Sequence, residues 1–414
     1  MSDRFGRRPA YLGCFALFIG ANIGLALQTQ YAALLALRCL QSSGSSGTIA
    51  LSNGVVSDLA TRAERGSYIG LAALGQSLGP ALGPVIGGLL THFLGWRSIF
   101  WFMIIYAGVM LMVFVTFIPE TCRNIVGNGS VPPQRWNRPL TAYLRLQKRP
   151  EDKIPLALGT AQKKRGPSIL ASIPILFEKE GFLILFYGGL IYAGFYIILA
   201  GLPSQLASTY HYNAIQIGLC YLPIGFGAIA SRPIVGRVVD WNFRRHARIQ
   251  GLEIVKSRQQ NIDNFPIERA RFEVGLPLVY LGCATFIPYG WVMGLEHPPL
   301  EAALILLFFS TFTLSGAFQT MNVLIVDCNP ASSAAASAAN NLTRCLLGAG
   351  GVAAVVPLLD KIGSGWTSTL IALVWFLFSA FWWVAIAWGP RWREEKRKRT
   401  QETMRPTRRR DERL

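Results

Sequence analysis

Two arginines lie inside long apolar stretches of the chain, where a charged side chain needs a specific partner. By helix rise, Arg38 would lie about 10 Å inside its stretch and Arg344 about 18 Å inside its own. A cation at such depth costs at least ~2.5 kcal/mol on insertion scales, so each should face a cavity, a partner or a substrate. Asn340 and Asn341 precede Arg344 and extend the polar face of the same predicted helix. For Arg344, contact with a structural partner is at least as good an interpretation as contact with a substrate.

Catalytic chemistry is not indicated. Hydroxyl side chains in the apolar stretches have no base at a recognisable spacing, so we do not expect an enzyme. The seven cysteines form no CxxC pair and no Cys/His cluster with metal-ligand spacing, which predicts no metal, no cofactor and no disulfide framework. The four histidines lie at or beyond the ends of the stretches, and we expect polar loop residues rather than a proton relay.

Exchange of protons would need a carboxylate that faces a cavity inside the membrane. The sequence offers none, because Asp58, Glu301 and Asp327 all lie at the ends of apolar stretches. The coupling acid therefore belongs to a part of the protein outside this sequence, or the chain does not couple to protons. Aromatic residues within such stretches more often serve packing than binding. The candidate substrate contacts are nevertheless the polar and aromatic side chains Tyr187, Tyr192, Tyr196, Gln319 and Asn322.

These residues must be positioned by helices that cross a membrane. The chain of 414 residues is 51% hydrophobic and only 15% charged, whereas roughly a quarter of a soluble domain is charged. About 20 apolar residues in a helix span the roughly 30 Å of a bilayer. Ten windows are long enough, at residues 9–29, 31–57, 66–90, 96–118, 182–206, 213–235, 275–295, 301–326, 332–356 and 366–388. We predict an all-α polytopic membrane protein with four spans in residues 1–118, a polar segment at 119–181, six spans in 182–388 and a basic tail at 389–414.

The net charge of +18 is concentrated in the connectors between the predicted spans. If Met1 lies in the cytosol and the spans alternate, the cytosolic segments hold 35 of the 40 lysines and arginines. This bias follows the positive-inside rule and predicts that both termini are cytosolic. The basic tail is most simply a solvated anchor near anionic lipid. Nucleic acid is an unsuitable partner, since the basic residues flank the membrane rather than cover a soluble surface.

A charged pattern recurs at matching places in the two halves. The first copy, DRFGRR, contains Asp3, Arg4, Gly6, Arg7 and Arg8. The second copy, GRVVDWNFRR, contains Gly236, Asp240, Arg244 and Arg245. We expect Gly236 to permit a tight exit from the preceding span. Four predicted spans follow each copy, but two precede the second and none precedes the first, so we expect that two spans of the first six-span half are missing from this sequence.

These motifs resemble those of the major facilitator superfamily, which comprises twelve-span secondary transporters with paired halves. A glycine, an aspartate and paired arginines resemble the superfamily's cytosolic loop motif. The stretch LLALRCLQSSG resembles its LxxxRxxQG motif, in which Arg38 and Gln41 match while Ser42 replaces the usual glycine. The resemblance implies a part in proton coupling for the arginine of this motif.

A further string, GPALGPVIGG, is a full GxxxGPxxGG motif, which in the superfamily marks drug:proton antiporters. The motif consists of Gly79, Gly83, Pro84, Gly87 and Gly88. Glycines four residues apart allow two helix backbones to approach closely, and Pro80 and Pro84 permit a bend. We expect this helix to be bent and closely packed, and to serve as a rocking contact between the halves.

Loop strings such as PETCRNIVGNGSVPP and NFPIERAR are similar to those of fungal drug:proton antiporters, in the branch of the quinidine-resistance and dityrosine transporters. The resemblance implies a monomeric plasma-membrane protein that exports a drug, toxin or secondary metabolite by alternating access, in exchange for protons. Two alternatives stay open. Arg38, Arg232 and Arg344 make the spans net positive, which suits an exporter of organic acids or other anions. A chain that lacks two spans is alternatively an inactive transporter.

Overall fold

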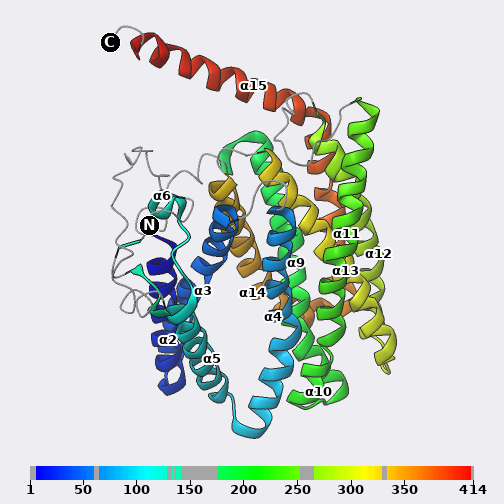
Figure 1. The fold of residues 1–414 in the computed structure, drawn as a ribbon. Coiled ribbons are helices and arrows are strands. Elements are labelled where there is room, and N and C mark those ends of the chain that lie inside the picture. The colour runs from blue at the N-terminus through cyan, green and yellow to red at the C-terminus, as the bar shows by residue number, and fades with distance from the viewer. Residues whose placement is uncertain are drawn as a thin grey trace. The chain divides into compact units, whose positions relative to one another are not determined.

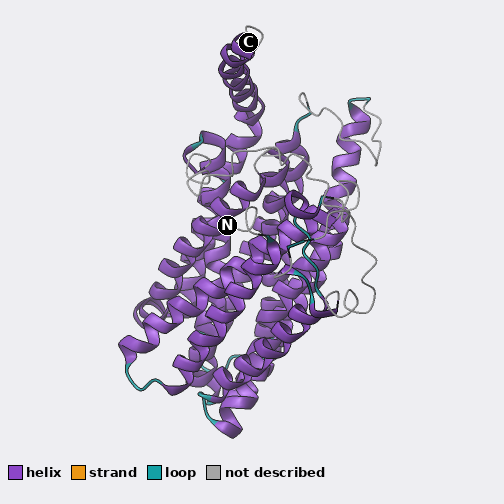
Figure 2. Cartoon of the chain, turned by 60° about the vertical axis from the view of Figure 1, so that its left-hand side comes forward, coloured by secondary structure: helices purple, strands orange, loops and turns teal. Residues whose placement is uncertain are grey.

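The structure, a computed structural model, describes residues 6–59, 65–127, 133–134, 137–141, 176–251, 265–328 and 333–411. Asp3 and Arg4 of the first charged pattern lie outside these ranges. The described residues form helices joined by loops, without a strand, as Figure 2 shows. The chain divides into two compact units: unit 1 comprises Met1–Gly75 and Ile86–Ser168, and unit 2 comprises Gln76–Val85 and Ile169–Leu414.

Unit 1 is built on three helices that pack together. They are α2 (Arg7–Leu27), α3 (Tyr31–Leu59) and α5 (Ser98–Phe117), and α2 contacts both of the others (Figure 1). The short α6 (Arg123–Val126) follows α5, and α4 (Arg65–Leu94) is divided between the two units. Gly44 of α3 allows close packing, because a Cβ there would lie 3.0 Å from the Cys14 carbonyl oxygen of α2. This approach lets polar side chains of α2 and α3 meet.

Unit 2 is a larger helical bundle with an aromatic centre. Its helices are α9 (Lys179–Tyr210), α10 (Ala214–Leu219), α11 (Leu222–Ile249), α12 (Ile267–Met293), α13 (Leu300–Cys328), α14 (Ser333–Phe378) and α15 (Ala380–Asp411). Helix α9 packs on α14, α11 packs on α13, and α12 packs on both α13 and α14. Trp382 is fully buried, with the Phe272 ring stacked 4.4 Å from it and the Tyr187 ring edge-on at 4.8 Å, between ring centroids. These rings join α9, α12 and α15.

The structure confirms that the chain contains helices able to cross a membrane. Seven helical segments of the described residues are long and apolar enough to cross a membrane, judged by length and composition. The last of them, Ala336–Glu395, contains Gly363 with φ of +77°, a left-handed conformation that breaks α14 between the predicted spans 332–356 and 366–388. Helix α3 is not among the seven, and α4 offers a shorter apolar helix, Leu78–Leu94. The all-helical membrane fold is therefore confirmed, and the number of ten spans stays a prediction.

Helices continue beyond the predicted spans at two places. The connector expected at 236–274 is helical at both ends, and the tail expected from 389 continues α15 as far as Asp411 (Figure 1). Charged pairs one helical turn apart support such solvated helix, as in the 2.8 Å ion pair of Lys398 with Glu394. Gly236 consequently lies inside α11 rather than at a tight exit from a span. The predicted span 213–235 is also interrupted, since α10 ends at Leu219 and α11 begins at Leu222.

Candidate functional site: two arginine clusters

The first arginine cluster lies in unit 1. Nη1 of Arg38 donates to Oε1 of Gln41 at 3.0 Å, and Nε2 of Gln41 donates to Oδ1 of Asn22 at 2.6 Å. The Arg38 guanidinium also lies 5.0 Å from the centroid of the Phe100 ring. Helices α2, α3 and α5 thus each supply one part of the cluster. The predicted pair of Arg38 and Gln41 is brought together here, and the buried Asn22 and the ring of Phe100 were not predicted.

The second arginine cluster lies in unit 2. Nε of Arg344 donates to Oδ1 of Asn341 at 2.9 Å, and the guanidinium lies 5.0 Å from the Tyr192 ring centroid. Tyr192 in turn lies 4.5 Å from Tyr196 and 5.5 Å from Phe318, between ring centroids. An aromatic wall from α9 and α13 therefore stands beside a cation from α14.

Amides extend the second cluster. Nδ2 of Asn340 donates to Oδ1 of Asn322 at 2.6 Å, which places both predicted asparagines together. Nε2 of Gln319 donates to the Arg232 carbonyl oxygen at 3.2 Å. Three buried polar atoms have no hydrogen-bond partner within the described residues: Oδ1 of Asn340, Oε1 of Gln319 and Nε of Arg232. Because buried polar atoms are nearly always bonded, these three are suited to hydrogen-bond a ligand or water.

The two clusters share one local pattern. In each, an arginine is tethered to an amide three residues away on its own helix and lies over an aromatic ring of another helix. Among the described residues, no carboxylate lies within ion-pair distance of Arg38 or Arg344. The Arg38 side chain is exposed and that of Arg344 is partly buried. Each unit therefore presents an uncompensated cation, which attracts an anionic group.

One predicted substrate contact lies elsewhere. The Tyr187 side chain is fully buried in the core of unit 2, and its hydroxyl donates to the Trp375 carbonyl oxygen at 2.8 Å. Its ring also meets Trp382 edge-on. This placement gives Tyr187 a packing role, and we carry only Tyr192, Tyr196, Gln319 and Asn322 forward as proposed contacts.

The first charged pattern organises one end of unit 1 around Glu120. This carboxylate accepts hydrogen bonds from the backbone N–H of Arg7 at 2.8 Å and of Arg8 at 3.1 Å, and from Nδ2 of Asn137 at 2.7 Å. Burial raises its pKa, but these hydrogen bonds and that from the Cys122 N–H outweigh burial and hold the pKa below the usual range. A carboxylate at the N-terminus of α2 is also favoured by the helix dipole. No sequence pattern singles out Glu120 beyond its place in the string PETCR.

Two further contacts fix the arginines of this pattern. Nε of Arg7 lies 2.9 Å from Oδ2 of Asp58, at the end of α3. The Arg8 guanidinium donates to the carbonyl oxygens of Val115 at 2.8 Å and Arg138 at 2.7 Å. The first charged pattern therefore ties the ends of α2, α3 and α5 together.

Gly6→Ala is expected to destabilise unit 1. Gly6 has φ of +109°, and a Cβ there would overlap the Glu120 carboxylate and lie 3.0 Å from Nδ2 of Asn137. With ψ of 160°, this backbone conformation alone costs a residue other than glycine about 1–3 kcal/mol. We expect a lower unfolding temperature in a lipid-stabilised melting assay. Gly13→Ala on α2 is the control, since nothing lies within 4 Å of its Cβ position, and an equal loss in both variants would contradict the assignment.

The second charged pattern lies along α11 in unit 2. Nη2 of Arg271 from α12 lies 2.9 Å from Oδ2 of Asp327 on α13, and Nη1 lies 3.8 Å from Oδ1 of Asp240. Arg244 and Arg245 are exposed on the same helix. This pattern therefore joins α11, α12 and α13 through an arginine that the sequence pattern does not contain.

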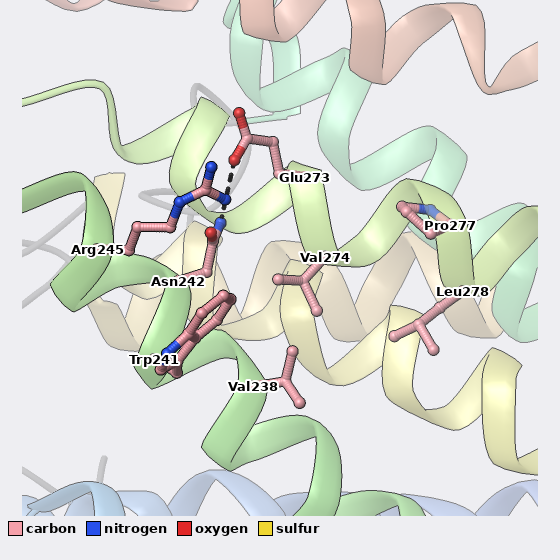
Figure 3. A pocket seen from close by; sticks show the side chains of 8 residues that line it. All are labelled: Val238, Trp241, Asn242, Arg245, Glu273, Val274, Pro277 and Leu278. Atoms are coloured by element: carbon pink, nitrogen blue, oxygen red, sulfur yellow. Dashed lines mark hydrogen bonds between the residues drawn. The ribbon is translucent and has the colours of Figure 1, made fainter. Parts of the chain in front are cut away.

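A pocket of about 490 Å³ lies beside the second pattern, between α11 and α12 (Figure 3). Its polar side has Arg245, Asn242 and Glu273, where Nδ2 of Asn242 donates to Oε2 of Glu273 at 3.3 Å. The remaining lining is Trp241 with the apolar side chains Val238, Val274, Pro277 and Leu278. Burial raises the pKa of Glu273, but hydrogen bonds from His246, Asn242 and Arg269 outweigh it and lower the pKa overall. The pocket is thus amphipathic, and its lining includes no residue of the arginine clusters.

The GxxxGPxxGG motif lies within α4, and its close contacts differ from the expected ones. A Cβ at Gly79 or Gly83 would meet no atom within 4 Å, and one at Gly87 would meet only Ile99 at 3.9 Å. The close approach in unit 2 instead uses neighbouring positions of the motif. A Cβ on Gly225 would overlap Ala81, and one on Gly218 would lie 2.7 Å from the Pro84 carbonyl oxygen. The glycines that permit this packing belong to α10 and α11.

Comparison with known proteins places the chain in a family. The profile of the Major Facilitator Superfamily matches residues 1–352. The chain belongs to the major facilitator superfamily. It is therefore a membrane transporter of that superfamily rather than an enzyme.

Two relatives and one solved structure agree with this membership. The chain is 47% identical over 395 residues to "MFS-type transporter R5" of Phoma sp. (strain ATCC 20986 / MF5453), covering 95% of this chain and 74% of the relative. It is 36% identical over 409 residues to "Citrate exporter 1" of Aspergillus niger, covering 96% of this chain and 76% of the relative. The human organic anion transporter MFSD10 (TETRAN) shares the fold, with a TM-score of 0.56 at 18% identity over 92% of this chain and 78% of that chain.

Proposed function

We propose that this transporter exports a small organic anion across the plasma membrane by alternating access, in exchange for protons, with both termini in the cytosol. The assignment of an anionic substrate rests on the two arginine clusters. In each cluster, an arginine contacts an amide and an aromatic ring. Within the described residues, neither cation has a carboxylate partner. A carboxylate on the substrate would supply the missing negative charge and accept charge-assisted hydrogen bonds.

The fungal relatives support this proposal. One of them, 36% identical to this chain, bears the name of a citrate exporter. Citrate is a small organic anion, and transferring that class to this chain is consistent with Arg38 and Arg344. Proton exchange is supported by the GxxxGPxxGG motif of α4, through its resemblance to drug:proton antiporters.

A second candidate is export of a hydrophobic drug, toxin or secondary metabolite. The aromatic wall formed by Tyr192, Tyr196 and Phe318 favours it, because stacked rings suit flat apolar molecules. The wall lies on the cation of Arg344, however, so a cationic drug would meet a like charge there. Within this candidate, a neutral or anionic metabolite fits better than a cation.

Transport by the full chain in liposomes separates these candidates. We expect uptake of radiolabelled citrate that unlabelled tricarboxylates compete for and that tetraphenylphosphonium, a hydrophobic cation, does not. A protonophore should stop the accumulation if protons are exchanged. If only the cation competes, the transporter exports drugs rather than organic anions. If the protonophore has no effect, the transporter does not exchange its substrate for protons. Absence of transport of either probe would contradict export by this chain.

A further inference from the structure

Four side chains that the proposed export does not use meet at one end of unit 2. Glu180 lies at the start of α9, Glu268 at the start of α12, Cys328 at the end of α13 and Arg393 on α15. Ligand atoms of the first three all lie within 4.8 Å of one another. All four residues belong to segments predicted to be cytosolic. We call this group the carboxyl cluster.

Arg393, the cation of the carboxyl cluster, forms its ion pair with Glu268. Nη2 of Arg393 donates to Oε2 of Glu268 at 2.8 Å and to the Phe265 carbonyl oxygen at 2.9 Å. Nε of Arg393 lies 2.6 Å from Oε1 of Glu268, but the two atoms are not aligned for a hydrogen bond. Glu268 is 0% exposed, so its charge is balanced by Arg393 alone. No second cation within the described residues is available for Glu180.

The nearest other charges are already paired. Asp327, next to Cys328 on α13, lies 2.9 Å from Nη2 of Arg271. Arg271 comes from α12 and also approaches Asp240 of α11 at 3.8 Å. These groups therefore bring no net positive charge to the carboxyl cluster.

Glu180 lies close to the paired carboxyl group of Glu268. Sγ of Cys328 donates to Oε1 of Glu180 at 3.5 Å, and a carboxyl oxygen of Glu180 lies within 4.8 Å of one of Glu268. Two carboxylates held so close away from water repel each other unless one of them carries a proton. The buried Oε1 of Glu268 also has no aligned hydrogen-bond donor among the described residues.

We propose that the carboxyl cluster is a proton-binding site, which holds one proton between Glu180 and Glu268 and releases it to the cytosol as the pH rises. With the proton, the two carboxyl groups and one guanidinium are neutral overall. Without it, two carboxylates at the starts of α9 and α12 face one cation and repel each other. This site is an addition to the proposed export and stands whatever the substrate class is.

The electrostatics agree with this geometry. Burial, and then the neighbouring Glu268 carboxylate, raise the pKa of Glu180 to about 7, and Arg393 offsets only part of the rise. Burial also raises the pKa of Glu268, and its contact with Arg393 opposes that rise. The cluster therefore changes its proton occupancy near the pH of the cytosol.

A metal ion is the competing occupant. Two carboxylates and a thiol are also a donor set that suits zinc. The Arg393 guanidinium, however, already lies against both oxygens of Glu268, so Glu268 would have to give up part of this ion pair to bind a metal. A proton between the two carboxyl groups leaves the ion pair intact.

Infrared difference spectroscopy of the full chain in lipid tests the site, by following the C=O stretch of protonated carboxyl groups from about pH 5 to about pH 9. We expect a band that disappears with a midpoint close to pH 7 and is absent from Glu180→Gln. Glu296→Gln is the matched control, because Glu296 is exposed just beyond the other end of α12.

The titration of the wild-type protein tests the proton-binding site even if Glu180→Gln does not fold. No carboxyl band titrating near pH 7 would overturn the proposal, as would a band that persists unchanged in folded Glu180→Gln. Added zinc is the third arm. Loss of the band at constant pH on stoichiometric zinc, reversed by a chelator, would show a metal site in place of the proton site.

Discussion

Replacing Arg344 by glutamine is expected to lower citrate transport by at least about tenfold while the protein stays folded. The substitution removes the cation beside Tyr192 but keeps a side chain that can still bond Asn341. A hydrogen bond to a charged group contributes about 1.5–3 kcal/mol, which corresponds to roughly ten- to a hundredfold in binding. Initial transport rates in liposomes, at several citrate concentrations, measure the loss.

Two matched variants sharpen this test. Arg344→Lys keeps the charge but loses the planar stacking on Tyr192, so we expect an intermediate rate. Lys361→Gln removes one exposed cation from the same helix and should transport as the wild type does. Wild-type transport by Arg344→Gln would show that the second arginine cluster binds no anionic substrate.

In each arginine cluster, the contact within one helix follows from the sequence, but the contacts with other helices do not. Arg344 and Asn341 are three residues apart on one helix, so their contact follows from helix geometry alone. The partners Asn22 and Phe100 of the first cluster come from other helices. Their positions depend on how the helices pack, which the apolar pattern of a single span leaves undetermined.

The packing of α4 shows the same limit. The spacing of Gly79 and Gly83 predicted a close helix contact there, but the contact uses Ala81 and Pro84. Small residues allow close approach on any face that carries them, and the partner decides which face is used. Here the partner glycines, Gly218 and Gly225, lie well over a hundred residues further along the chain.

The interpretation of the basic tail rests on composition, which cannot reveal that one of its arginines is paired with a buried carboxylate. Most of its arginines fit a solvated helix near lipid. Arg393 instead reaches Glu268, 125 residues away in sequence, and Glu180 bonds Cys328 across 148 residues. A scan for carboxylates deep in the predicted spans missed this pair, because Glu180 and Glu268 lie two and seven residues before the predicted spans 182–206 and 275–295.

Arg393→Met is expected to be among the most destabilising single changes in unit 2. Removing one partner of a buried ion pair costs about 3–5 kcal/mol, since the remaining charge stays buried without compensation. Glu268 is 0% exposed and has no other cation within the described residues. We expect a lower unfolding temperature in lipid than for Arg391→Met, a control that removes an exposed arginine of the same helix.

The dependence of this loss on pH identifies its cause. The raised pKa of Glu180 means that the stability of the carboxyl cluster is complete below the unfolded value of the carboxyl group and is lost as the pH rises through about 7. Without Arg393, both carboxyl groups rely on protonation, so the deficit should be largest at alkaline pH and shrink on acidification. Glu268→Gln in the Arg393→Met background should recover part of the stability at alkaline pH. A deficit that is independent of pH, or that Glu268→Gln deepens, would show that Arg393 acts through packing of its aliphatic stem rather than by balancing a buried charge.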